Sequence, residues 1–132
     1  MKYDTSKTGW ETIRVDYAAD ILEKFILEWR PTGEPFEMDT RRAFEYELAE
    51  RQEQDLTISR ASVIFELNKM ADMGLLTWRD KTGKGGHHKV YRLAMTPHEL
   101  EALVVTRLLK HVKENWPQAY AEVVPKLEDL EG

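Results

Sequence analysis

The sequence has 132 residues, of which 42% are hydrophobic, enough for one modest core with one or two appended helices. It contains no cysteine, which excludes disulfides and thiolate metal sites, and its formal net charge of -5 does not by itself suggest a polyanionic partner. Residues 1–7 lack the apolar stretch of a signal peptide and the apolar runs elsewhere are too short to span a bilayer, so we expect a cytoplasmic protein without a membrane partner.

The first predicted elements are two helices separated by a short extended piece. Asp16 is a suitable cap for a helix that Pro31 and Gly33 end. Its apolar positions follow the spacing of one buried face: Ala18, Ile21, Leu22, Phe25, Ile26 and Trp29. Residues 36–38 alternate apolar with charged, and Asp39 or Thr40 can cap a second helix running to about Gln52. We expect its inner face to be Ala43, Phe44, Leu48 and Ala49.

A third helix is predicted between Ser59, a good cap, and Gly74, a good terminator. The inner face of this helix is defined by apolar residues about one helical turn apart: Val63, Leu67 and Met70. At 100° per residue, the opposite face then holds Ala61, Ser62, Phe65, Asn68, Lys69 and Asp72.

Two runs rich in strand formers follow, residues 75–79 and 89–93. The glycine-rich, basic residues 81–88 lie between them, so the sequence predicts a hairpin with a long tip. A Walker phosphate-binding loop is excluded, because such a loop ends in Gly-Lys-Ser/Thr and opens a helix, whereas this one leads into a strand.

Thr96 to Glu99 form a capping box with Pro97 at the first helical position, and the helix that follows carries a wide apolar stripe. Trp116-Pro117 ends it, and one more helix follows, shortened or interrupted by Pro125. This stripe is wider than packing against the preceding elements needs, so we expect a homodimer interface containing Leu100, Leu103, Val104, Leu108, Val112 and Trp116.

Charge is unevenly distributed along the chain. Residues 1–56 carry 8 Lys/Arg and 14 Asp/Glu, residues 57–96 carry 7 and 3, and residues 97–132 carry 4 and 7. The basic middle segment is the one that holds the third helix and the hairpin. This distribution is expected if one face alone meets phosphates.

The order of these elements, together with four short stretches, resembles bacterial and archaeal winged helix-turn-helix regulators of the penicillinase-repressor, PadR and MarR kinds. The stretches are residues 48–51, 58–63, 67–76 and 85–93, and the resemblance covers about residues 16–112. It implies a mainly α fold with a small β wing (helix-strand-helix-helix-strand-strand) plus C-terminal dimerisation helices. The expected division is an N-terminal arm of residues 1–15, a DNA-binding domain of residues 16–95 and a dimerisation segment of residues 96–132.

The resemblance also implies a function: a homodimeric transcription regulator, more often a repressor, that reads a pseudo-palindromic operator in double-stranded DNA. By position, the residues implied to contact DNA are Arg60, Ala61, Ser62, Phe65 and Lys69 on the third helix and Lys84, His87, His88 and Lys89 on the wing.

One departure from the pattern keeps an alternative open. Ile64 and Phe65 stand where such helices usually carry polar or basic side chains, so this helix lacks a central arginine that could bind guanine with two hydrogen bonds. Either Phe65 contacts thymine methyls, or the helix belongs to a winged-helix module that binds another protein and little or no DNA.

The other candidate sites have simpler interpretations. The four histidines lack the spacing of a metal site, so no metal or cofactor is expected. The acidic residues Glu45, Glu47, Glu50, Glu53 and Asp55 are interpreted as a solvated helix face, and no enzyme activity is expected. Trp29 and Trp78 are expected in the core, and Trp10 and Trp116 at the dimer interface, with a small-molecule effector pocket between core and dimer helices left open.

Overall fold

The computed structural model describes residues 2–83 and 86–127. For His87 it describes only the backbone. Lys84, a predicted wing contact, therefore lies outside the described residues, as does the side chain of His87. The chain divides into two compact units, Met1–Pro97 and His98–Gly132, and each is described by itself.

The first unit begins with the short 3-10 helix η1 (Gly9–Thr12), followed by α1 (Asp16–Leu27), α2 (Thr40–Gln52) and α3 (Arg60–Asp72). The predicted caps of α2 and α3 are confirmed. Asp39 accepts a hydrogen bond from the backbone N–H of Arg42, and Ser59 accepts one from that of Ser62. The cap of α1 was predicted one residue late, since Val15 occupies the cap position and Asp16 is the first helical residue. Gly74 follows α3 at φ 79°, a conformation that a side chain would disfavour.

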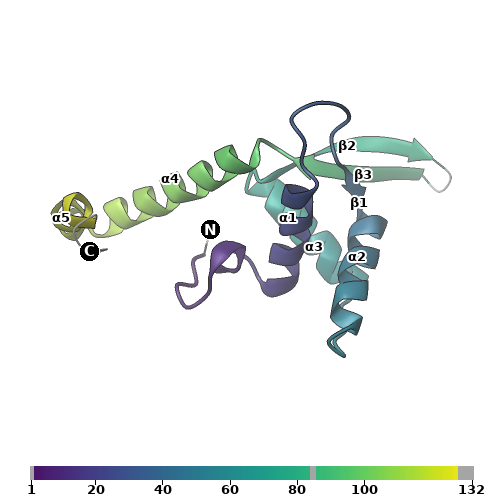
Figure 1. The fold of residues 1–132 in the computed structure, drawn as a ribbon, viewed down its shortest axis with the longest axis horizontal. Coiled ribbons are helices and arrows are strands. Elements are labelled where there is room, and N and C mark those ends of the chain that lie inside the picture. Colours follow the sequence, from purple (N-terminus) through teal and green to yellow (C-terminus); the bar gives the residue numbers. More distant parts are fainter. Residues whose placement is uncertain (1, 84–85, 128–132) are drawn as a thin grey trace. The chain divides into compact units, whose positions relative to one another are not determined.

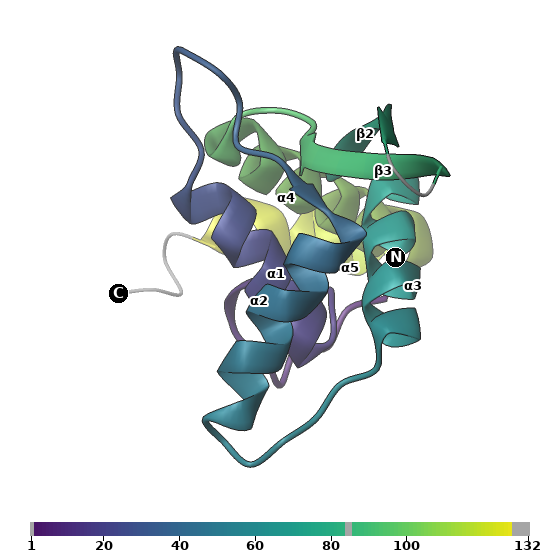
Figure 2. The ribbon, with the colours of Figure 1, turned by 90° about the vertical axis from the view of Figure 1, so that its right-hand side faces the viewer.

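Three antiparallel strands, β1 (Met38–Asp39), β2 (Leu76–Gly83) and β3 (Gly86–Leu93), form a sheet in the order β1-β3-β2. Met38 pairs with Tyr91, and β2 pairs with β3 from Leu76↔Leu93 out to Gly83↔Gly86. The hairpin tip is therefore much shorter than predicted, because strand pairing extends through most of residues 81–88. Figures 1 and 2 show α1, α2 and α3 on one side of this sheet, with the β2–β3 hairpin reaching past them.

The core lies where the three helices meet the base of the sheet. Val63, Leu67 and Met70 of α3 are fully buried, so the predicted inner face of this helix is confirmed. The other large buried side chains are Ile21, Leu22, Phe25, Met38, Leu75 and Tyr91. Because α3 packs against this core on one side, the residues on its other side remain in contact with solvent.

Some predicted core positions were wrong. Trp29, which follows the end of α1, is 36% exposed, and Trp78, on the wing strand β2, is 44% exposed. On α2, Ala43 is buried as predicted, Phe44 and Leu48 are half-buried and Ala49 is exposed. Glu47, interpreted as part of a solvated face, is fully buried instead.

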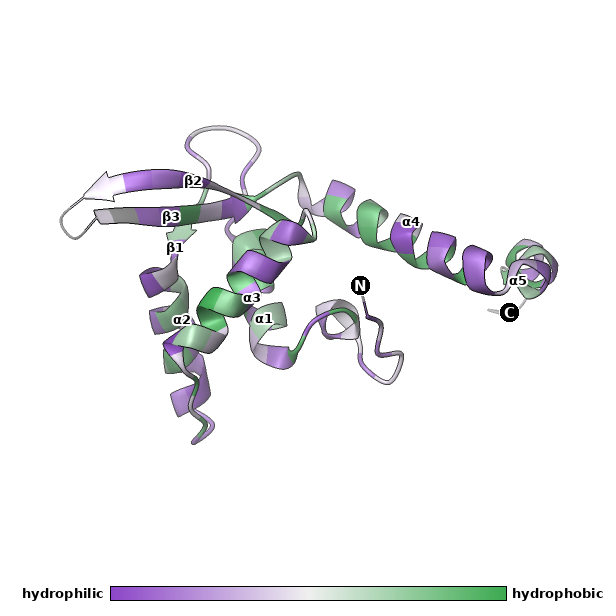
Figure 3. Cartoon of the chain, turned by 180° about the vertical axis from the view of Figure 1, so that it is seen from behind, coloured by the Kyte–Doolittle hydropathy of each residue, from purple (hydrophilic) through white to green (hydrophobic). Residues whose placement is uncertain are grey.

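The second unit continues from α4 (Pro97–Asn115) into α5 (Pro117–Val123) and the 3-10 helix η2 (Val124–Lys126). The predicted start at Pro97 and the break at Trp116-Pro117 are both confirmed. Along α4, hydrophobic and hydrophilic residues occupy different sides of the helix, as Figure 3 shows by colour. None of the helices in the described part of the chain is long and apolar enough to cross a membrane.

The element order of the first unit, helix-strand-helix-helix-strand-strand, is that of a winged helix, with α2 and α3 as the helix-turn-helix and β2–β3 as the wing. The predicted fold class is confirmed.

Candidate nucleic-acid interface

The outer face of α3 presents one large apolar side chain between two basic ones. Phe65 is 60% exposed because it points away from Val63, Leu67 and Met70. Lys69 is one turn further on, with its Nζ 5.6 Å from the centre of the Phe65 ring. Ala61 and Arg60 lie exposed in the first turn. Along the helix, the exposed ring of Phe65 therefore lies between two exposed cations, Arg60 and Lys69.

The N-terminal end of α3 is closed by two serines. Ser59 Oγ accepts from the Ser62 backbone N–H at 3.1 Å, and the two hydroxyl oxygens are 2.8 Å apart. Ser62, predicted to contact DNA, is half-buried and already hydrogen-bonded to Ser59. Its hydroxyl can still accept one further bond, but its main role in this structure is to complete the cap.

The wing presents two different faces, since residues that pair across β2 and β3 point to the same side. One face carries the exposed residues Lys81, His88 and Arg92. Arg79, on the same face, donates two hydrogen bonds to Glu37, at 2.9 and 2.8 Å. The bonds from Arg79 hold the pKa of Glu37 below its usual value. On this face Lys81, Arg92 and His88 are therefore exposed to a partner, whereas the guanidinium of Arg79 is already paired with Glu37.

The other face of the wing lies toward α3. Lys89, which the resemblance implies to contact DNA, is half-buried there. Its Nζ is 4.4 Å from the centre of the Trp78 ring and 3.3 Å from Asn68 Oδ1. The Tyr91 hydroxyl also donates to Asn68 Oδ1, at 2.7 Å. Sequence reasoning missed this link between α3 and the wing. The alternation of β3 places Lys89 and Tyr91 on one side, but only the packed structure shows that this side meets Asn68.

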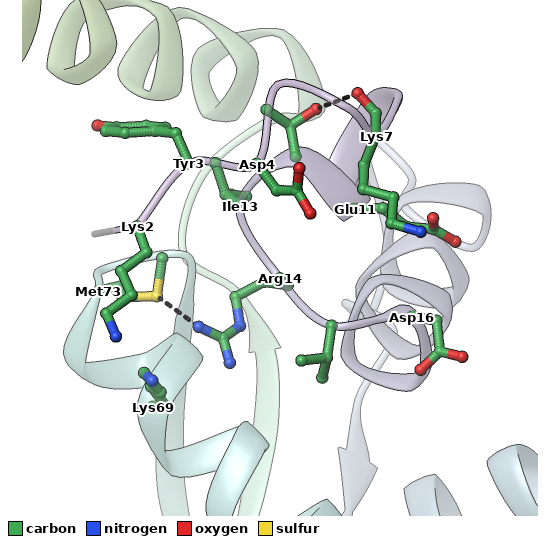
Figure 4. A pocket seen from close by; sticks show the side chains of 12 residues that line it. Lys2, Tyr3, Asp4, Lys7, Glu11, Ile13, Arg14, Asp16, Lys69 and Met73 are labelled. Carbon is green, nitrogen blue, oxygen red and sulfur yellow. Dashed lines mark hydrogen bonds between the residues drawn. The ribbon is translucent and has the colours of Figure 1, made fainter.

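A buried ion pair fixes the segment before α1 to the opposite flank of α3. Arg14 donates from Nη2 to the Glu66 carboxylate, and both side chains are more than nine-tenths buried. Nη1 of Arg14 contacts the Met73 sulfur at 4.0 Å (Figure 4). Neither Arg14 nor Glu66 was singled out from the sequence, because a long-range ion pair has no local signature.

An open hollow of about 780 Å³ lies beside this ion pair. It is bordered by Lys2, Lys7, Arg14, Lys69 and Met73 among others, from the N-terminal arm and α3 (Figure 4). Tyr3 is the one aromatic residue among its lining residues. The hollow is thus neither aromatic-lined nor where an effector pocket was expected, and the effector stays a prediction.

Within the described residues, no group of three or more histidines and carboxylates could hold a metal ion. The residues predicted for the dimer interface differ in exposure in the single chain. Leu100 is buried, Trp116 is 59% exposed, and Leu103, Val104, Leu108 and Val112 are half-buried. Val105 and Leu109 on α4 are 53% and 38% exposed, and neither was in the predicted interface.

Comparison with known proteins adds little to this geometry. No protein-family model matches the sequence, and no curated protein matches it. Among solved structures, the chain is similar to PadR of Bacillus subtilis in complex with operator DNA, with 19% identity and a TM-score of 0.43 over 88% of this chain and 72% of that chain. A likeness at this level is too weak to carry a functional argument, and which winged-helix group the chain belongs to stays a prediction.

Proposed function

We propose that this protein is a transcription regulator that binds duplex DNA as a homodimer, acting as a repressor. The observation that carries the proposal is Phe65, a large apolar side chain that is 60% exposed on the outer face of a helix-turn-helix. The ring lies beside the exposed Lys69, so the outer face of α3 offers a partner an apolar and a charged contact together. Its position on α3, which in this fold enters the major groove, favours DNA as that partner.

The proposed contacts divide into base-reading and backbone contacts. Phe65 and Ala61 would lie against thymine methyl groups, and Arg60 and Lys69 would neutralise phosphates on either side. On the wing, the exposed cations Lys81 and Arg92 and the neighbouring His88 would bind the DNA backbone. In this arrangement Lys89 supports the wing through Trp78 and Asn68, and this departs from its predicted role as a phosphate ligand.

The homodimer is proposed from the second unit. In the single chain it leaves several large apolar side chains exposed: Val105, Leu109, Trp116, Val123 and Leu127. A second copy would cover them, and two-fold symmetry would then present two α3 helices to a pseudo-palindromic operator. Half-sites about 34–36 Å apart, one helical turn, are the spacing such a dimer reads.

A second candidate function is a winged-helix module that docks on another protein through α3. The same exposed Phe65 favours it, because an aromatic anchor suits a protein interface as well as a groove. The exposed cations around Phe65 and on the wing are the reason to prefer DNA.

The test is selection of bound duplexes from a random pool, followed by affinity measurements at several salt concentrations. We expect an enriched palindromic site and a log-log salt slope that falls by about 0.9 for each phosphate contact removed. Arg60→Ala should lower that slope. The matched control is Lys110→Ala, which removes the same charge from an exposed position on α4 and should leave the slope unchanged. No enrichment together with negligible duplex binding would contradict the proposal and leave the protein-docking function.

A further inference from the structure

Asn68 on α3 is held by two hydrogen bonds from β3. Its Oδ1 accepts from the Tyr91 hydroxyl at 2.7 Å and from Lys89 Nζ at 3.3 Å. These contacts come from residues 21 and 23 positions further along the chain, so they are tertiary contacts between the helix and the wing.

The chemistry of the two donors fixes the orientation of the amide. An ammonium group can only donate, so the Asn68 atom that faces Lys89 must be the carbonyl oxygen and not the amide nitrogen. Tyr91 is fully buried, and burial raises the pKa of its hydroxyl, which therefore stays protonated and donates to the same oxygen. A carbonyl oxygen has two lone pairs, and both are now occupied.

The amide nitrogen of Asn68, Nδ2, takes no part in these two hydrogen bonds. Within the described residues, Asn68 Nδ2 makes no hydrogen bond. It is also not among the buried side-chain atoms that lack a partner, so it reaches solvent. Asn68 stands one turn after Phe65 on the half of α3 turned away from Val63 and Leu67. The Asn68 side chain thus presents two N–H donors and no free acceptor beside the exposed aromatic ring.

We propose, resting on the DNA-binding function above, that Asn68 reads a base as a donor only, so that it favours guanine or thymine, disfavours cytosine and binds adenine less well than guanine. In the major groove, guanine offers two adjacent acceptors, O6 and N7, and thymine offers O4. Adenine offers N7 beside an N6 donor that repels an amide N–H, and cytosine offers the N4 donor without an acceptor. The usual pairing of asparagine with adenine needs a free carbonyl oxygen to accept from N6. Tyr91 and Lys89 occupy that oxygen, which makes them positioning residues.

Reversal of the hydrogen-bonding character at this position tests the proposal. Asn68→Asp replaces the two donors by an acceptor, so duplex selection with this variant should change one position per half-site from guanine or thymine to adenine or cytosine. Asn68→Ala, which introduces no charge, should lose the preference at that position by roughly tenfold in relative affinity. The matched control is Lys69→Gln, which changes the net charge by the same amount as Asn68→Asp and should weaken all sites without reversing any position.

A further variant tests the positioning role. Tyr91→Phe keeps the ring but frees one lone pair of the Asn68 oxygen, so adenine should be better tolerated at the same position while other positions stay unchanged. A shift of all positions together would indicate a purely structural role for Tyr91 and would overturn its assignment.

The outcomes separate this proposal from the one it rests on. If the unmodified protein enriches a defined site and Asn68→Ala and Asn68→Asp enrich the same site with the same base preferences, the assignment of Asn68 is wrong and the DNA-binding function stands. If the unmodified protein enriches no site, the function itself is wrong and the assignment fails with it. Circular dichroism of each variant confirms that the fold is retained before the selections are compared.

Discussion

Replacement of Glu47 by glutamine should stabilise this protein at alkaline pH. The Glu47 side chain is fully buried on α2 and interacts with the carboxyl of Asp20 on α1, to which it can donate a hydrogen bond only when it is protonated. Its nearest cation is Arg51, whose Nη1 is 3.9 Å from Oε1. Burial raises the pKa of Glu47 to about 8, and the negative charge of Asp20 adds to the effect. A buried carboxylate beside a second carboxylate is costly, whereas the carboxamide of glutamine carries no charge and can still donate a hydrogen bond to Asp20.

The direction of the pH dependence follows from the difference between the folded and unfolded pKa. Because the folded protein holds this proton up to about pH 8 and the unfolded chain releases it near 4.5, the free energy of unfolding falls as pH rises between these values. Each pKa unit corresponds to about 1.36 kcal/mol, so the loss above pH 8 is at most about 4 to 5 kcal/mol. Relaxation around the charged group and water entry reduce it, and we expect Glu47→Gln to recover about 2 to 4 kcal/mol at pH 9 and close to none at pH 4.

Thermal and urea unfolding of the original protein and the variant at pH 4, 6, 7.5 and 9 measure this difference. The matched control is Glu50→Gln, which removes the same charge from an exposed position on the same helix and should change stability by less than about 0.5 kcal/mol at every pH. If the gain from Glu47→Gln were the same at pH 4 and pH 9, ionisation of Glu47 would not be its cause. A loss of stability at pH 9 would show that the ionised form is stabilised by Arg51 and would refute the reasoning.

Three further changes test other parts of the structure. Phe65→Ala should change the free energy of unfolding by less than about 0.5 kcal/mol, because the ring is 60% exposed, while relaxing base preference at one or two positions per half-site; a large drop in melting temperature would mean that the ring packs in the core. Arg14→Met should cost about 3 to 5 kcal/mol because it leaves Glu66 buried without its partner, and adding Glu66→Leu should restore most of the loss; an unchanged melting temperature for the single variant would argue against a buried pair. Val105→Asp with Leu109→Asp in the full chain should convert the proposed dimer to a monomer in sedimentation velocity, and a dimer that persists would place the interface elsewhere.

The ends of α2, α3 and α4 could be predicted from the sequence because their signals are local. Asp39 and Ser59 cap helices by accepting hydrogen bonds from residues three positions ahead. Pro97 begins α4 because its ring fixes φ at a helical value and its missing N–H would have no helical partner at this position. The inner face of α3 was predictable for a similar reason, since three apolar side chains at helical spacing allow one buried side only. From that face the exposure of Phe65 followed directly.

The features that the sequence did not predict depend on contacts between distant segments. Whether Glu47 is solvated depends on where α1 lies against α2, and neither helix encodes that position in its own periodicity. The wing was expected to have a long tip because glycines discourage strands, but pairing with β3 extends β2 to Gly83. Lys89 was expected to contact DNA, but its Nζ donates to Asn68 because the packing of β3 against α3 brings the two side chains together. The sequence by itself determined which residues could form the helices and face outward on α3, because those choices rest on local hydrogen bonds and spacing. Only the tertiary structure decided how Asn68 presents its amide, because that depends on two donors from another element.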